Sequence, residues 1–224
     1  MTHFEQELAA LKDRLLTMAS HAEEAVKDAV EALISRDYDL ARRVRESDGV
    51  IDQFEIEVDE LSIHLLAKAP LASNLRMIAV VMKISQNLER VGDEASKIAN
   101  RARELSDEPP LKLTVEIPKM ADMALQMLRG ALDAFVNSDP VSARALIPRD
   151  KEVDALNKKI YRELAEYMIS HPDTITRCLN LIIAAKSLER IADHATNVAE
   201  EVVYLCEAED IRHTGKGTKV SQIT

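Results

Sequence analysis

The sequence predicts an all-α protein built as two tandem three-helix bundles. Three observations lead to this prediction. Glycine and proline together supply 12 of 224 residues, about 5%, where an average chain has roughly 12%. Turns are therefore few, and the elements between them are long. Apolar residues recur at spacings of three and four, which is the period of one helix face. The chain also matches itself at a fixed offset, as an internal duplication does.

The duplication covers most of the chain. At an offset of 102 residues, Asp48 and Asp52 lie over Asp150 and Asp154. Further along, the offset is 100, and residues 88–93 (Leu-Glu-Arg-Val-Gly-Asp) lie over 188–193 (Leu-Glu-Arg-Ile-Ala-Asp). We expect the two copies to be related by an approximate two-fold axis.

A double proline, Pro109-Pro110, separates the copies. Because proline cannot continue a helix, it marks a linker. The predicted organisation is a first repeat at 1–106, a linker at 107–114, a second repeat at 115–210 and a frayed tail at 211–224.

The first repeat is predicted to hold four helical segments. Its first helix, which ends near Ser35, has an apolar face made of Phe4, Leu8, Leu11, Leu15 and Met18. A short helix then runs to about Glu46. Residues 47–49 (Ser-Asp-Gly) are typical of an N-cap region and predict that a new helix starts there and runs to about Lys68.

Pro70 is expected to break the chain before the longest helix, at about 73–105. The second repeat follows the same plan, with helices at about 115–137, 141–147, 150–170 and 172–208. A helix of ~33 residues is ~50 Å long, so we expect an elongated molecule.

Composition excludes several classes of protein. The 29 basic and 39 acidic residues leave a net charge of −10, and aromatic residues make up only 3%. A nucleic-acid binder needs a basic face and stacking platforms, so we expect no nucleic-acid partner. The longest apolar run, 77–82, is too short to span a bilayer, and residues 1–5 lack the basic and apolar pattern of a signal peptide, so we expect none. These features predict a soluble, cytoplasmic protein. Cys178 and Cys206 are expected to be free core thiols.

Four acidic pairs at spacing i, i+4 fall at matched positions of the two copies. This spacing puts both carboxylates of a pair on one helix face. The pairs are Asp48/Asp52 and Glu89/Asp93 in the first copy, and Asp150/Asp154 and Glu189/Asp193 in the second. The simplest interpretation is a solvated surface, with Arg90 and Arg190 neutralising the acids.

A metal site is the second interpretation of the pairs. Like charges at i, i+4 each cost ~0.2–0.5 kcal/mol, yet all four pairs persist in both copies. If adjacent helices bring two pairs together, four oxygen donors converge, which suits Mg²⁺, Mn²⁺ or iron. Asn197 extends the second line by one turn, whereas the first copy has Lys97 there. His194 is expected to be exposed or an auxiliary ligand. A ferritin-like di-iron site is excluded, because no Glu is followed by His three residues later.

These motifs resemble those of the PhoU family. The doubled Glu-Arg-[Val/Ile]-[Gly/Ala]-Asp resembles the family's Glu/Asp-x-x-x-Asp signature, and residues 39–44, 72–76 and 210–213 also fit. The likeness covers nearly the whole chain. Two positions depart from the family pattern. Ala192 replaces the usual glycine of the second motif, and Ser96 stands where some relatives have another acid.

The resemblance implies two tandem three-helix bundles in a cytoplasmic homodimer that meets the membrane only through its partners. It also implies a non-enzymatic regulator of phosphate uptake. Such a protein is an adaptor between the ATPase subunit of the high-affinity ABC phosphate transporter and a phosphate-sensing histidine kinase, and it negatively regulates the phosphate-starvation response. One cluster of iron, manganese, magnesium or zinc is implied for each repeat. The ligands carried over are Asp48, Asp52, Glu89, Asp93, Asp150, Asp154, Glu189, Asp193 and Asn197.

Two other functions stay open. The chain could be a structural or regulatory helical protein of another transporter, which only the identity of its partner separates from the first function. It could also be a metal-cluster phosphohydrolase, since paired cations can activate water. Turnover of simple phosphate esters would distinguish that enzyme.

Overall fold

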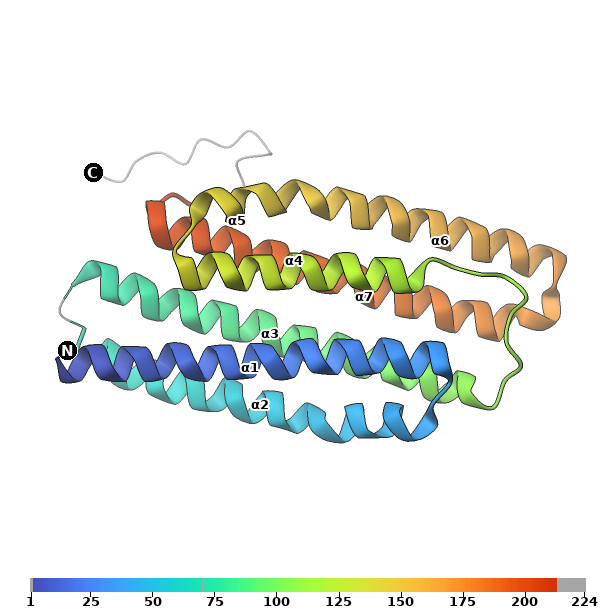
Figure 1. Ribbon diagram of the computed structural model, residues 1–224, viewed down its shortest axis with the longest axis horizontal. Helices are drawn as coiled ribbons and strands as arrows, with labels where there is room; N and C mark the ends of the chain where they lie inside the picture. Colours follow the sequence, from blue (N-terminus) through green and yellow to red (C-terminus); the bar gives the residue numbers. More distant parts are fainter. Residues whose placement is uncertain (1, 70, 213–224) are drawn as a thin grey trace.

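The computed structural model describes residues 2–69 and 71–212, and every regular element within them is helical. The first repeat folds into α1–α3, and the second into α4–α7 (Figure 1). The predicted all-α fold of two three-helix repeats is confirmed. The elements are α1 (His3–Ser35), α2 (Tyr38–Leu66), α3 (Ala72–Ser106), α4 (Ile117–Asn137), α5 (Pro140–Leu146), the 3₁₀ turn η1 (Ile147–Arg149), α6 (Asp150–Ser170), the 3₁₀ turn η2 (Pro172–Thr174) and α7 (Ile175–Glu207).

The predicted restart of a helix at 47–49 is wrong. Helix α2 runs through this segment without a break, and the Ser47 hydroxyl donates to the Val44 carbonyl inside the helix instead of capping a new one. The second repeat does break at the matched place, where η1 separates α5 from α6. Pro148 stands there, opposite Glu46 of the first repeat. A proline lacks the N–H that a continuous helix requires, so only this copy is interrupted.

Helices α1, α3, α4 and α7 lie at the centre of the molecule, with α2 on one outer side and α5 and α6 on the other (Figure 1). The two repeats meet where α3 packs along α7. Along this seam Lys83 pairs with Glu201 at 3.0 Å, and Arg101 donates to Asn180 at 3.2 Å. Residue numbers rise on one helix as they fall on the other, so the two helices are antiparallel. This is the arrangement expected of repeats related by an approximate two-fold axis.

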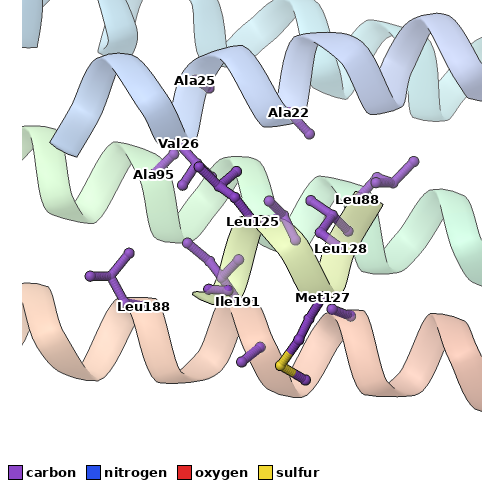
Figure 2. Packing of buried hydrophobic residues seen from close by; sticks show 14 of the residues in the cluster. Ala22, Ala25, Val26, Leu88, Ala95, Leu125, Met127, Leu128, Leu188 and Ile191 are labelled. Atoms are coloured by element: carbon purple, nitrogen blue, oxygen red, sulfur yellow. The ribbon is translucent and has the colours of Figure 1, made fainter. Parts of the chain in front are cut away.

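The two repeats share one apolar core rather than burying two separate ones. Figure 2 shows Val26 of α1, Leu88 of α3, Leu128 of α4 and Ile191 of α7 in one packed cluster. Val26, Leu88, Leu128 and Ile191 are all fully buried. The bundles are therefore joined by hydrophobic packing as well as by the linker.

Helices α2 and α3 approach closely at Gly92. A Cβ at this position would lie only 2.8 Å from Ile51 Cδ1. The second repeat has Ala192 at the position of Gly92 and Val153 at that of Ile51, and both are fully buried. In the first repeat, Gly92 leaves room for Ile51 Cδ1. Val153 has no such atom, so the second repeat can fill the same space with the methyl group of Ala192.

Some sequence predictions fall at the edges of the described chain. Pro70 and residues 213–224 lie outside the described residues. At the start of the predicted tail, Ile211 packs against the core and Arg212 pairs with Glu201 at 3.3 Å, so these two positions are held in place. Cys178 is a buried thiol as expected, but Cys206 is exposed. Over residues 2–69 and 71–212, no helix is both long enough and apolar enough to cross a membrane.

Candidate functional site

The structure brings the four predicted carboxylates of the first repeat into one electrostatic group. Helix α2 supplies Asp48 and Asp52, and α3 supplies Glu89 and Asp93. Burial, reinforced by the charges of Asp52 and Asp93, raises the pKa of Asp48. Burial and the charge of Asp93 likewise raise the pKa of Glu89. Arg90 pairs with Glu89 at 3.3 Å, as the surface interpretation expected.

Two further acids of α2, Glu55 and Asp59, belong to this group. Burial raises the pKa of Glu55, and the charges of Asp59 and Asp52 add to the shift. The sequence does carry a signal for them, because 52, 55 and 59 lie on one helix face. Their counterparts in the second repeat are Asn157 and Tyr161, so a search for acids shared by both copies passes over them.

The second group forms between α6 and α7 from Asp150, Asp154, Glu189 and Asp193. Partial desolvation raises the pKa of Asp193 to about 6, and the charges of Asp150, Glu189 and Asp154 contribute. The Oδ1 atom of Asp150 is buried and has no hydrogen-bond partner among the described residues. Lys186 pairs with Glu189 from one turn away on α7.

Asn197 and His194 face the α3–α7 seam. Asn197 Nδ2 donates to Asn87 Oδ1 at 3.2 Å, and His194 Nδ1 lies 3.0 Å from the same oxygen. His194 is half-buried rather than exposed, and its burial lowers its pKa. Asn197 thus bonds across the seam to the other repeat, and its role as a ligand stays a prediction.

The seam carries an open groove of about 640 Å³ next to both acidic groups. Glu94 lies in its wall, only 4% exposed, and pairs with Lys97 at 2.8 Å and with Arg190 at 3.2 Å. The expectation that Arg190 neutralises an acid of its own motif is therefore wrong. Arg190 crosses to the first repeat instead and helps to hold the two repeats together.

The matched halves of this fold identify the family. The family model of the PhoU domain matches residues 15–102 and again residues 117–202. The chain belongs to the PhoU family. Its two acidic groups lie at matched positions of the two PhoU domains, one in each.

Known PhoU proteins are similar over nearly their whole length. The "Phosphate-specific transport system accessory protein PhoU homolog" of Pseudomonas aeruginosa is 44% identical over 214 residues, covering 95% of this chain and 88% of that protein. The Escherichia coli K12 "Phosphate-specific transport system accessory protein PhoU" is 35% identical over 213 residues, with the same two coverages.

Solved PhoU structures share the fold. The crystal structure of PhoU from Pseudomonas aeruginosa superposes with a TM-score of 0.89 at 43% identity, covering 92% of this chain and all of that one. The phosphate transport system regulatory protein PhoU from Streptococcus pneumoniae gives 0.87 at 26% identity, covering 93% and 99%.

The residues of both groups suit a metal chemically. Carboxylate oxygens are the ligands that hard cations prefer. Burial, together with the charges of neighbouring acids, raises the pKa values of Asp48 and Asp150, and a bound cation would favour the charged form of both carboxylates. The buried Asp150 Oδ1 atom, which lacks a hydrogen-bond partner among the described residues, is a further donor that a cation could use. In the described part of the chain, however, no three His, Cys, Asp or Glu side chains converge closely enough to hold a metal ion. Metal binding therefore stays a prediction.

Proposed function

We propose that this PhoU-family chain is a non-enzymatic regulator of phosphate uptake. It works in the cytoplasm as an adaptor between the ATPase subunit of the high-affinity ABC phosphate transporter and a phosphate-sensing histidine kinase, and it keeps the phosphate-starvation response off when phosphate is plentiful. One observation carries the proposal. Both repeats match the PhoU domain, and relatives 35–44% identical are named as accessory proteins of a phosphate-specific transport system.

We further propose that each acidic group holds one metal cluster of iron, manganese, magnesium or zinc. Asp48, Asp52, Glu89 and Asp93 would hold the first, and the matched acids of α6 and α7 the second, with Asn197 as an added donor. A bound cation neutralises the carboxylates and links two helices of one bundle. It also supplies positive charge on a chain of net charge −10, where a phosphate group would otherwise be repelled.

An affinity pull-down from the native cell tests the adaptor role. The membranes are solubilised at high phosphate, and co-purified proteins are identified by mass spectrometry. We expect the phosphate-transporter ATPase or the histidine kinase among the recovered proteins. Light scattering of the purified chain should show a homodimer. Recovery of another transporter's subunits, without the phosphate-transporter ATPase or the histidine kinase, would refute the proposal. It would favour a structural or regulatory role at that other transporter.

The phosphohydrolase is tested separately with p-nitrophenyl phosphate and metal-loaded protein. We expect no turnover above that of a matched blank. Turnover that disappears in a Glu89→Ala/Asp93→Ala variant would show an enzyme and overturn the non-enzymatic assignment.

A further inference from the structure

A groove of about 680 Å³ is lined by residues of α6 and α7 in the second repeat. Helix α6 lies on an outer side of the molecule (Figure 1). Apolar surface comes from Tyr161, which is 58% exposed, and from half-buried Ile182. Three cationic side chains line the same groove. They are Lys158 and Arg162 from α6 and Lys186 from α7.

The apolar surface continues along α7 beyond the groove. Ile175, Leu179 and Ile183 are each more than 40% exposed, and they follow one another at a spacing of four. A helix with residues of this kind at i, i+4 and i+8 normally turns them toward a packing partner. Here they face outward, next to Ile182, and so form one stripe with the groove.

The duplication provides an internal comparison for this surface. Lys158, Tyr161 and Arg162 lie over Ile56, Asp59 and Glu60 of the first repeat, and the matched positions on α3 are Met82 and Gln86. Where the second repeat has three positive charges, the first has none and carries two negative charges. The corresponding hollow of the first repeat is polar and lined by Glu55, Gln86, Asn87, Glu89 and Arg90.

This difference shows that the fold does not require the groove. Both repeats form the same three-helix bundle, and the first does so with Asp59 where the second has the exposed ring of Tyr161. The structural roles of these positions therefore do not account for the basic and apolar side chains of the second repeat. Among the described residues, no ion pair involves Lys158 or Arg162, whereas Lys186 pairs with Glu189.

We propose that the α6–α7 groove binds an acidic amphipathic helix of a partner protein. The apolar side of such a helix, with anchors at i, i+3 or i+4 and i+7, would lie on Tyr161 and Ile182, as in other helix-in-groove complexes. Its flanking Asp and Glu side chains would meet Lys158, Arg162 and Lys186. Since the chain has a net charge of −10, an acidic partner is repelled by most of its surface, so these cations select the site and orient the helix. The proposal rests on the adaptor role and assigns one of its docking surfaces.

A defined peptide tests the groove without knowledge of the natural partner. The probe is a fluorescein-labelled helical peptide of about 18 residues, or five turns, with Leu on one face and Glu on its flanks. A second peptide has Lys in place of every Glu. Fluorescence anisotropy with the full chain should show binding of the Glu peptide, weakened by salt, and much weaker binding of the Lys peptide.

Variants locate the binding. Lys158→Glu/Arg162→Glu should lower the affinity for the Glu peptide by about tenfold or more. Tyr161→Ser should also lower this affinity, without a change in the net charge of the protein. Lys27→Glu/Arg43→Glu is the matched control, because it reverses two exposed charges of the first repeat. The control should bind like the wild type. Equal affinity for both peptides, or equal losses in the control and the groove variant, would overturn the proposal.

Two other occupants give different results. If a second copy fills the groove, light scattering will show a wild-type dimer that Lys158→Glu/Arg162→Glu dissociates. If an anionic membrane fills it, the wild type will sediment with phosphatidylglycerol vesicles, the groove variant will not, and the peptide will fail to bind. Either result overturns the partner helix. If the Glu peptide does not bind but the transporter ATPase still co-purifies, only the assignment of the groove is wrong. If the peptide binds but the pull-down recovers no phosphate transporter, the adaptor role is wrong.

Discussion

Replacing Gly92 with alanine should destabilise the first repeat through its contact with Ile51. The added Cβ would lie 2.8 Å from Ile51 Cδ1 and 3.4 Å from Ile51 Cγ2. Ile51 is only 2% exposed, so its side chain must shift within the packed core to admit the new methyl group. Overpacking of this kind costs ~1–3 kcal/mol, while alanine in a helix recovers ~1 kcal/mol relative to glycine. The expected net loss in the free energy of unfolding is about 1 kcal/mol.

A second substitution should rescue the first. Ile51→Val removes Cδ1 and alone costs about 1 kcal/mol, because it leaves a small cavity. In Ile51→Val/Gly92→Ala the new methyl fills that space, which is the pairing that Val153 and Ala192 provide in the second repeat. The double variant should therefore be close to the wild type, although the two single losses sum to about 2 kcal/mol. The coupling energy between the sites is then about 2 kcal/mol.

The assay is urea unfolding followed by circular dichroism, on the wild type, both single variants and the double variant. Gly49→Ala is the control, since nothing lies within 4 Å of a Cβ there, and it should gain up to ~1 kcal/mol from helix propensity alone. A double variant whose loss equals the sum of the single losses would refute the argument. So would a Gly92→Ala protein that is stabilised as much as Gly49→Ala.

Three further predictions concern the metal, a helix cap and a strained residue. Glu189→Ala/Asp193→Ala should lower the metal content of the purified protein, measured by elemental mass spectrometry, by about one cluster; an unchanged content would mean that these acids bind none. Without metal that variant should be no less stable than the wild type, because it removes like-charge repulsion. The Asp139 carboxylate caps α5 by accepting hydrogen bonds from Ser142, and these bonds lower the pKa of Asp139. The cap therefore stabilises the fold fully above the ordinary carboxyl pKa, and this stabilisation is lost as the pH falls through the lowered pKa. Asp139→Ala should lower the unfolding midpoint at neutral pH and Asp139→Asn much less, with the difference between Asp139→Ala and wild type shrinking in acid. Ala208 has a φ of 58°, and a left-handed backbone strains any residue with a Cβ. Ala208→Gly should therefore raise the protein's free energy of unfolding by ~1 kcal/mol. A decrease would show that the Ala208 methyl group makes stabilising contacts.

The sequence predicted the helices well because their signals are local and periodic. The one failure, at 47–49, shows where such signals compete. Ser47 and Gly49 are poor helix residues in isolation, and glycine costs ~1 kcal/mol in a helix interior. Packing of α2 against α1 and α3 outweighs that cost. In the second repeat, Pro148 lacks the N–H that a continuous helix needs, and the predicted break between α5 and α6 is present there.

The candidate site was predicted to the extent that the two copies agree. The acidic pairs found by comparing the repeats interact electrostatically in the structure, one group in each bundle, and their metal binding stays a prediction. Glu55 and Asp59 were missed because that comparison keeps only shared residues. A search for residues shared by the two repeats also misses the α6–α7 groove. Its residues Tyr161 and Ile182 come from different helices, and both differ from their counterparts in the first repeat. Likeness between copies finds what both do, and only their differences show what one of them does alone.

The core that spans the α3–α7 seam also determines what the covalent chain contributes to assembly. Residues 107–110 of the linker are exposed, and a protease could reach them. Cutting there would leave each half with a large apolar face already buried against the other, together with ion pairs such as that between Lys83 and Glu201. The two fragments should remain associated and elute as one particle. In that sense the chain behaves like an obligate dimer whose subunits happen to be tied end to end.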